Sequence, residues 1–311
     1  MTELITVTGV SKSYDRIRAV ADASFTLRKG EILGFLGPNG AGKTTAMKMI
    51  IGYMPADTGD IRVHGRNIVD DPIAARNAIG YLPENNPLYT DMTVEEYLTF
   101  VAQMRGVADP DAAKKRAMER CAIVDVRHRI IGHLSKGYRQ RVGLAQAIIH
   151  DPEILILDEP ANGLDPIQIT EIRGLIRDLG REKSVILCSH ILSEVEAVAS
   201  RVIIINQGKI VADDTLENLK ERSSGHNIFR IEFLTAKDER TVADALAKIP
   251  GVAAVSRVAN DTFRVKTKGE RETGNQIFRA AVAENWDLAQ IHLESRSLEN
   301  TFLSLIEGGN G

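Results

Sequence analysis

Alternating apolar and polar positions open the chain. Residues 3–30 alternate in the manner of β-strands, and the alternation breaks at Gly9 and at residues 29–30. A short apolar segment, residues 32–36, follows and runs directly into a glycine-rich loop. The pattern predicts strands with one solvated face, followed by a buried strand that ends at the loop.

Helical periodicity begins at Lys43, immediately after that loop. Residues 92–131 are predicted to be mostly helical, with a break at residues 106–110, which begin with Gly and end with Pro. A further helix is predicted over residues 136–150, ending before Pro152.

Two near-continuous aliphatic segments, residues 154–157 and 184–188, flank a predicted helix at 167–180. Strands of this kind are typical of a parallel sheet that is covered on both faces. The sequence Asn206-Gln207-Gly208 predicts a hairpin turn between two further strands.

A second domain is predicted beyond a polar linker at residues 221–225. Its expected order is βαββαβ, the split pattern of ferredoxin-like domains, followed by a last helix at 298–306. The elements are strands at 228–234, 252–258, 261–267 and 287–293, with helices at 238–248 and 272–284. We therefore expect domains at residues 1–222 and 227–311.

Composition and charge narrow the functional classes. The 311 residues are 43% hydrophobic and 26% charged, with a formal net charge of -3, which favours no nucleic-acid partner. The basic run at 114–116 is interleaved with acids at helical spacing, as on a solvated helix face. Cys121 and Cys188 form no CxxC motif, as expected for a reducing compartment. We expect neither a secretory signal nor a membrane-spanning helix, because no aliphatic run approaches the ~20 residues that a span needs.

The glycine-rich loop carries the clearest chemistry. It consists of Gly37, Pro38, Asn39, Gly40, Ala41, Gly42, Lys43, Thr44 and Thr45. It matches G-x-x-x-x-G-K-T, in which glycines let consecutive backbone N–H groups curl around phosphate at a helix N-terminus. Lys43 is expected to neutralise the β- and γ-phosphates, and the Thr44 hydroxyl to hold Mg²⁺.

Two acids end the predicted strand at 154–157. An aspartate at the carboxyl end of a parallel strand lies where nucleotides bind in such sheets. Asp158 suits a direct or water-bridged contact to Mg²⁺, and Glu159 suits a general base that polarises the attacking water.

With these motifs the chain resembles the nucleotide-binding subunits of ABC transporters. Residues 134–141, Leu-Ser-Lys-Gly-Tyr-Arg-Gln-Arg, are similar to the family signature. Residues 163–166, Gly-Leu-Asp-Pro, resemble its D-loop, and His190 is placed like its switch histidine. Tyr14 precedes the loop at the distance where the family stacks an aromatic ring on adenine.

The resemblance implies roles for these residues. Ser135, Gly137, Gln140 and Asp165 would contact ATP, and His190 would reach its γ-phosphate and take part in catalysis. In the family the signature of one subunit closes over the ATP held by another. The single ATPase unit here therefore implies a dimer of two copies with two ATP molecules between them.

One position departs from the common pattern. Where the family usually has a glutamine near Mg²⁺, this chain has Glu84, followed by Asn85-Asn86-Pro87. We interpret Glu84 as a working substitute with catalytic and metal-binding roles, because this stretch, the signature and the C-terminal residues 294–302 resemble the ABC-2 export branch. A carboxylate is a harder Mg²⁺ ligand than an amide, but it adds negative charge beside the triphosphate.

The expected architecture is an α/β P-loop ATPase domain with a mixed sheet, an antiparallel β subdomain and a helical subdomain at about 90–150, plus a small α+β ferredoxin-like domain. The expected function is ATP hydrolysis for export through separate polytopic membrane subunits, on the cytoplasmic face of the inner (plasma) membrane. The alternatives are a mechanochemical ATPase acting on ribosomes or DNA, and a nucleotide-gated regulator. The second domain is either regulatory or dimer-stabilising, or a passive extension.

Overall fold

The computed structural model describes residues 2–222, 227–267, 272–294 and 302. By its internal contacts the chain divides after Leu216 into two compact units, which are described separately. Helix α8 (Leu216–Arg222) begins at this division and reaches into the expected linker. Leu219 of this helix is buried, which the polar sequence around it does not indicate.

A six-stranded sheet forms the centre of the first unit, in the order β10-β9-β3-β8-β7-β6. Its strands are β3 (Ile32–Leu36), β6 (Ile79–Leu82), β7 (Ile154–Asp158), β8 (Ser184–Ser189), β9 (Arg201–Asn206) and β10 (Lys209–Thr215). All neighbours are parallel except β10, which pairs antiparallel with β9 through the predicted turn. The predicted mixed sheet is confirmed.

Successive side chains along the buried strands belong to two different apolar cores, one on each face of the sheet. Ile154 and Ile156 of β7 pack in one core, and Leu155 and Leu157 pack in the other. Because successive side chains point to opposite faces, a strand that is apolar throughout needs cover on both faces. The predicted coverage of both faces is confirmed.

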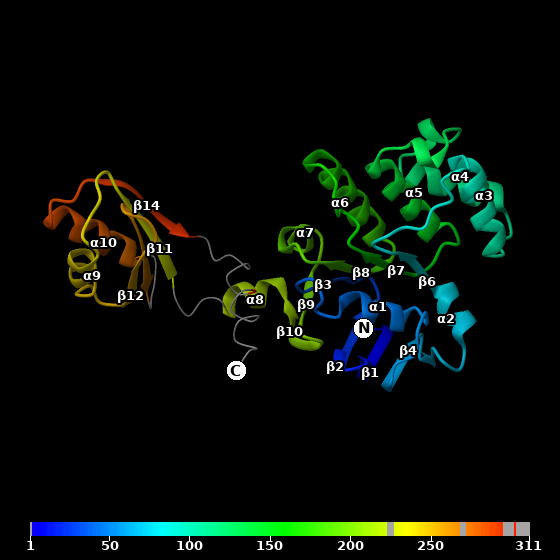
Figure 1. Ribbon diagram of the computed structural model, residues 1–311, viewed down its shortest axis with the longest axis horizontal. Coiled ribbons are helices and arrows are strands. Elements are labelled where there is room, and N and C mark those ends of the chain that lie inside the picture. Colours follow the sequence, from blue (N-terminus) through cyan, green and yellow to red (C-terminus); the bar gives the residue numbers. More distant parts are fainter. Residues whose placement is uncertain (1, 223–226, 268–271, 295–301, 303–311) are drawn as a thin grey trace. The chain divides into compact units, whose positions relative to one another are not determined.

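A second sheet, of order β2-β1-β4-β5, shares the first core with helix α1 (Lys43–Ile50). It is antiparallel, as predicted, and consists of β1 (Glu3–Tyr14), β2 (Ile17–Arg28), β4 (Thr58–Val63) and β5 (Arg66–Asn67). The first core therefore holds α1 between two sheets (Figure 1).

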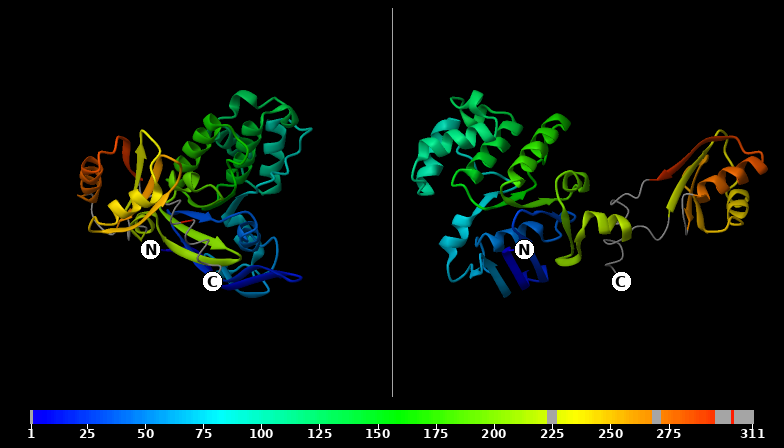
Figure 2. Two further views of the ribbon diagram at one scale, coloured as in Figure 1. Left: turned by 60° about the vertical axis from the view of Figure 1, so that its left-hand side comes forward. Right: turned by 180° about the vertical axis from the view of Figure 1, so that it is seen from behind.

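Helices α3 to α6 contribute to the second core, and they lie together on one side of the central sheet in every view (Figures 1 and 2). The helices of this unit are α2 (Pro72–Ala78), α3 (Val94–Met104), α4 (Pro110–Arg120), α5 (Lys136–Ile148), α6 (Pro166–Gly180) and α7 (Leu192–Glu196). Thr93 starts α3 with a capping box. Gly106 at φ 64° and Pro110 at the first turn of α4 produce the predicted break.

The second unit has the predicted βαββαβ order and an antiparallel sheet, β12-β13-β11-β14. Its elements are β11 (Asn227–Phe233), α9 (Glu239–Leu246), β12 (Val252–Arg257), β13 (Thr262–Thr267), α10 (Glu272–Ala283) and β14 (Leu288–Glu294). Phe229, Phe233 and Phe263 alternate into its separate apolar core. The helix predicted at 298–306 lies outside the described residues, apart from position 302.

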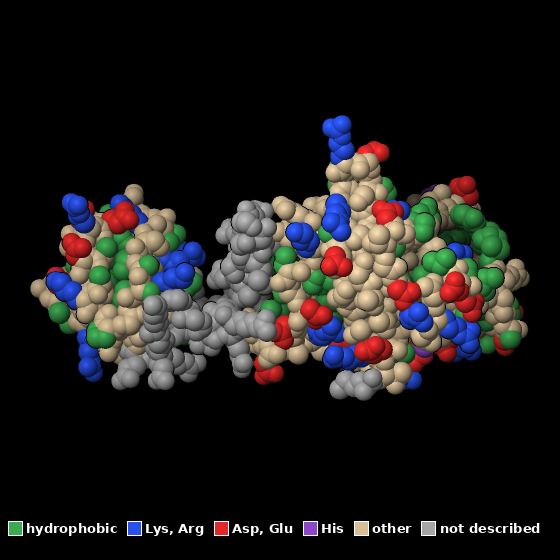
Figure 3. Space-filling model, turned by 90° about the horizontal axis from the view of Figure 1, so that it is seen from below, with side chains coloured by type: hydrophobic (Ala, Val, Ile, Leu, Met, Phe, Trp, Pro, Cys, Tyr) green, Lys and Arg blue, Asp and Glu red, His purple; other side chains and the backbone are tan. Residues whose placement is uncertain are grey.

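The surface carries mixed charge. On the face drawn in Figure 3, Lys and Arg side chains are interspersed with Asp and Glu rather than gathered by sign. Among the helices that the structure describes, none is both long and apolar enough to cross a bilayer.

Candidate nucleotide-binding site

The loop between β3 and α1 has a backbone conformation that requires glycine at two positions. Gly40 and Gly42 have φ of 79° and 106°. A Cβ on Gly42 would lie 2.2 Å from the Ala19 carbonyl oxygen, and one on Gly37 would lie 2.4 Å from that of Ile205. The loop is therefore pressed against β2 and β9, which leaves its backbone N–H groups at the start of α1 for an anion.

Lys43 lies folded over this loop. Its buried ammonium donates to the carbonyl oxygens of Gly37, at 2.7 Å, and Pro38, at 3.3 Å. Its Nζ also lies 3.4 Å from Oε1 of Glu159. The loop thus holds a cation above a helix N-terminus, the arrangement that triphosphate binding requires.

Glu159 connects this cation to the predicted switch histidine. Its Oε2 lies 2.8 Å from Nδ1 of His190, while its Oε1 faces Lys43. Its backbone has φ of 49°, unusual for a residue with a side chain, and its N–H donates to the Cys188 carbonyl at 2.9 Å. The turn after β7 thus places Glu159 in contact with both Lys43 and His190, two other predicted site residues.

The Asp158 carboxylate is fully buried, and both oxygens lack a hydrogen-bond partner. Its pKa is raised to about 6, mainly by burial; the charges of Glu159 and Glu84 also raise it, while the nearby Thr44 hydroxyl and the Lys43 ammonium lower it. A divalent cation would relieve this unpaired, buried charge. Mg²⁺ binds one or two carboxylates together with substrate phosphates, so Asp158 and the nearby Thr44 hydroxyl fit this ion. Among the described residues, no group of three or more His, Cys, Asp or Glu side chains could hold a metal by itself.

This buried carboxylate predicts a pH-dependent stability. Because the folded-state pKa of Asp158 is raised above 3.8, its contribution to stability is greatest below about pH 4 and is lost as the pH rises through about 6. Asp158→Asn should therefore raise the free energy of unfolding of the nucleotide-free protein by roughly 1–3 kcal/mol more at pH 8 than at pH 4. Urea unfolding at both pH values, with the exposed Asp91→Asn as control, measures this; an equal effect at both would contradict it.

A cavity of about 300 Å³ joins the loop to two acids. It is lined by Ala19, Asn39, Gly40, Ala41, Gly42, Lys43, Thr44, Thr45, Glu84 and Glu159. Glu84 Oε1 accepts a hydrogen bond from the Asn162 amide at 3.2 Å. Sequence reasoning missed Ala19, which no motif marks, and gave no role to Asn162.

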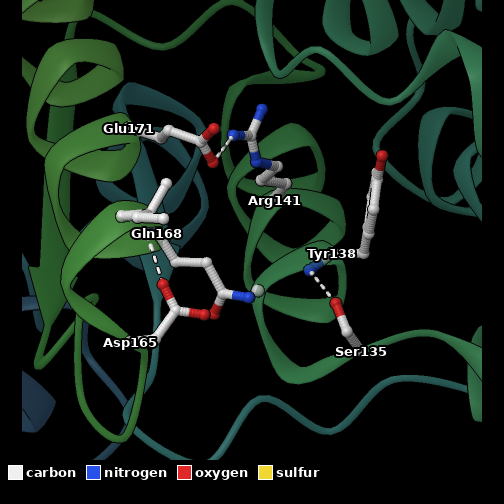
Figure 4. A pocket seen from close by; sticks show the side chains of 8 residues that line it. Ser135, Tyr138, Arg141, Asp165, Gln168 and Glu171 are labelled. Carbon is white, nitrogen blue, oxygen red and sulfur yellow. Dashed lines mark hydrogen bonds and ion pairs between the residues drawn. The ribbon is translucent and has the colours of Figure 1, made fainter.

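Four residues of the signature line a different pocket, of about 430 Å³, between α5 and α6: Ser135, Gly137, Tyr138 and Arg141 (Figure 4). Ser135 caps α5 and accepts from the Tyr138 N–H at 3.4 Å, and Asp165 caps α6 and accepts from the Gln168 N–H at 2.9 Å. Gly137 lies against Gln168 so closely that a Cβ would approach its amide to 2.9 Å. The structure therefore brings Ser135, Gly137 and Asp165 together, away from the residues that line the loop cavity.

Two predicted ligands have other partners. Gln140 is buried and donates its amide to the Pro160 carbonyl at 3.1 Å, which ties α5 to the segment after β7. Tyr14 is 43% exposed, and its hydroxyl donates to Met54 Sδ at 3.1 Å; neither residue lines either pocket. Their contacts with nucleotide remain predictions.

Comparison with known proteins identifies the class. The family model for ABC transporters matches residues 20–162, and the model for the C-terminal domain of DrrA1-3-like ATP-binding proteins matches residues 215–306. The chain is 33% identical to the bacitracin transport ATP-binding protein BcrA of Bacillus licheniformis, over 99% of both chains. It therefore belongs to the family of ABC transporter ATP-binding proteins, which are ATPases.

Further matches place it within that family. The chain is 33% identical to the linearmycin resistance ATP-binding protein LnrL of Bacillus subtilis (strain 168), over 95% of this chain and 96% of that protein. Together with the DrrA-like domain, these relatives place it among the ATP-binding subunits of the ABC-2 export branch.

Solved cassettes share the fold. An ATP-binding subunit of an ABC transporter is 29% identical, with a TM-score of 0.64, over 70% of this chain and 92% of that one. A dimeric cassette in a post-hydrolysis state, bound to ADP and Pi, is 20% identical, with a TM-score of 0.63, over 68% of this chain and 99% of that one. The predicted P-loop ATPase fold of the ABC type is confirmed.

Proposed function

We propose that two copies of this chain close around two ATP molecules, each held by the loop cavity of one copy and the Ser135 pocket of the other. The observation that carries this proposal is the separation of the two groups within one chain: the loop cavity lacks Ser135 and Gly137, and their pocket lacks Lys43. Each copy therefore carries two partial ATP sites, and each partial site is completed by the other copy. The dimeric cassette among the structural relatives supports the same assembly.

Within such a site each residue has a chemical task. Lys43 and the loop N–H groups bind the triphosphate. Thr44, Asp158 and Glu84 would hold Mg²⁺, directly or through water, and the ion would supply positive charge to the phosphates. Glu159 accepts the proton of the attacking water, and the 2.8 Å contact with His190 orients its carboxylate. The remaining predicted ligands are Tyr14 and Gln140, whose polar atoms donate to Met54 and Pro160 in the single chain.

A groove on the helical subdomain suits a membrane partner. It has a volume of about 550 Å³ and is lined by Met92, Thr93, Glu95, Glu96, Thr99, Phe100, Gln103 and His128. Beside it the exposed Tyr89 packs its ring 5.5 Å from that of Phe100. A short amphipathic helix of a polytopic membrane subunit would place an apolar side chain on Phe100 and basic groups beside Glu95 and Glu96.

This groove would hold the chain peripherally on the cytoplasmic face of the inner (plasma) membrane. Relatives are named for bacitracin transport and for linearmycin resistance, so cargo differs between members of the branch. We assign the choice of cargo to the membrane subunits.

The groove yields a direct prediction. Phe100→Asp should abolish co-purification with the polytopic membrane protein encoded nearby, because it places a charge in the apolar floor, and it should leave the ATPase rate of the chain alone within about twofold. The exposed Ile73→Asp, outside the groove, is the matched control. Capture of ribosomes or DNA instead of a membrane protein would favour the mechanochemical alternative.

Glu84 decides the other alternative. If the chain is a regulator that barely hydrolyses ATP, wild-type turnover is near zero and Glu84→Gln restores it. The transport proposal predicts measurable ATP turnover in the wild type. Glu84 lines the loop cavity, and the Asn162 amide holds its carboxylate there, where it can act in place of the usual glutamine.

A further inference from the structure

Glu194 is a buried acid, 3% exposed, on α7, and it lies outside both pockets. Its Oε2 accepts a hydrogen bond from the Ser189 hydroxyl at 2.7 Å. The same hydroxyl oxygen accepts from the Ile191 N–H at 3.0 Å. Ser189 and Ile191 are the two neighbours of His190 in the sequence, so one hydrogen-bonded chain holds the turn on both sides of the histidine.

The surroundings of Glu194 make this burial costly. Its Oε1 is buried without a hydrogen-bond partner, and burial raises the pKa of the carboxyl. The hydrogen bond from Ser189 lowers that pKa, the negative charge of Glu159 raises it, and the positive charge of Arg173 lowers it. A buried acceptor without a partner is unfavourable for stability, so stability alone gives little reason for an acid at this position.

Arg173 supplies the nearest link to another element. It lies on α6, and its guanidinium donates to the Ser193 hydroxyl at a long 3.4 Å, while its Nε is buried without a partner. Asp165, which caps the N-terminus of α6, lines the Ser135 pocket. The segment around His190 therefore contacts Glu159 on one side and, through Ser193 and Arg173, helix α6 on the other.

We propose that Glu194 is a positioning residue for ATP hydrolysis: through Ser189 it fixes the turn that carries His190, and so keeps Nδ1 of His190 on the Glu159 carboxylate. Glu194 itself touches neither nucleotide nor Glu159. Without the acceptor, the Ser189 hydroxyl keeps its bond to the Ile191 N–H but loses its link to α7, and His190 leaves its contact with Glu159 for part of the time. The proposal rests on the roles assigned above to Glu159 and His190.

Steady-state ATP hydrolysis by the full-length chain tests it. Glu194→Ala and Ser189→Ala should each lower kcat about 10-fold, the effect of one lost hydrogen bond in the transition state, and leave the KM for ATP within about twofold. Glu194→Gln should retain most activity, because its amide oxygen still accepts from Ser189. The exposed Glu119→Ala is the matched control.

A double-mutant cycle with His190→Ala separates positioning from general support of the fold. In the His190→Ala background, Ser189→Ala and Glu194→Ala should lower kcat by less than about twofold further, because they act through the missing imidazole. If either change lowers kcat as much in the His190→Ala background as in the wild type, the proposal is overturned. Full activity of Ser189→Ala would also overturn it. Ser189→Ala remains a test of the proposal even if Glu194→Ala fails to fold. If His190→Ala alone retains full activity, the role proposed for His190 is overturned as well.

Discussion

Glu159→Gln is expected to lower ATP hydrolysis by about 10²–10⁴-fold while ATP binding persists. The amide keeps the shape of the side chain and can still accept a hydrogen bond from His190, but it cannot take a proton from water. Because Lys43 lies 3.4 Å from this carboxylate, loss of its charge also frees the ammonium for phosphate. ATP affinity should therefore stay equal or increase. Single-turnover hydrolysis and equilibrium ATP binding measure the two effects separately.

Glu153→Gln is the matched control for this variant. Glu153 precedes the same strand but pairs with Lys29 at 2.8 Å, away from both pockets. It should hydrolyse ATP at close to the wild-type rate. Hydrolysis by Glu159→Gln within about tenfold of wild type would remove Glu159 from the role of general base.

Lys43→Met is expected to weaken ATP binding at least about 30-fold, because a buried, hydrogen-bonded charge on a phosphate contributes about 2–5 kcal/mol. The methionine fills a similar volume without the ammonium, which at present donates to Gly37 and Pro38. It also leaves Glu159 buried without its cation, so a lower melting temperature should accompany the loss.

Fluorescent ATP-analogue titration measures this loss, and Lys48→Met on the same helix is the control. Lys48 lies in the last turn of α1, where it faces the Tyr53 ring at 5.9 Å rather than the loop. Equal affinity of the two variants would mean that the ammonium of Lys43 does not bind phosphate.

Features set by residues near one another in the sequence could be predicted. The loop from Gly37 to Thr45 follows from its glycines, and β7 and β8 follow from unbroken aliphatic segments that only a sheet covered on both faces can bury. The break at 106–110 follows from one glycine and one proline. The βαββαβ order of the second unit follows from strand and helix periodicity.

Contacts between distant segments could not be predicted. Nothing in the signature indicates that Gln140 donates to Pro160 rather than facing a pocket. The Ala19 carbonyl that excludes a side chain at Gly42 comes from β2, far away in sequence. The sequence does not mark Glu194, because acids are common on short helices and α7 carries two; only the burial of Glu194 and its contact with Ser189 distinguish it.

The central claim, that each site is shared by two copies, is tested most directly by the molar mass of Glu159→Gln with ATP and Mg²⁺, measured by light scattering with and without the second change Ser135→Glu. We predict the mass of two chains for Glu159→Gln. We predict the mass of one chain for Glu159→Gln/Ser135→Glu, because the new carboxylate would face the γ-phosphate of the partner's ATP, while ATP still binds to each copy. A single-chain mass for Glu159→Gln, or a dimer that Ser135→Glu leaves intact, would contradict the account.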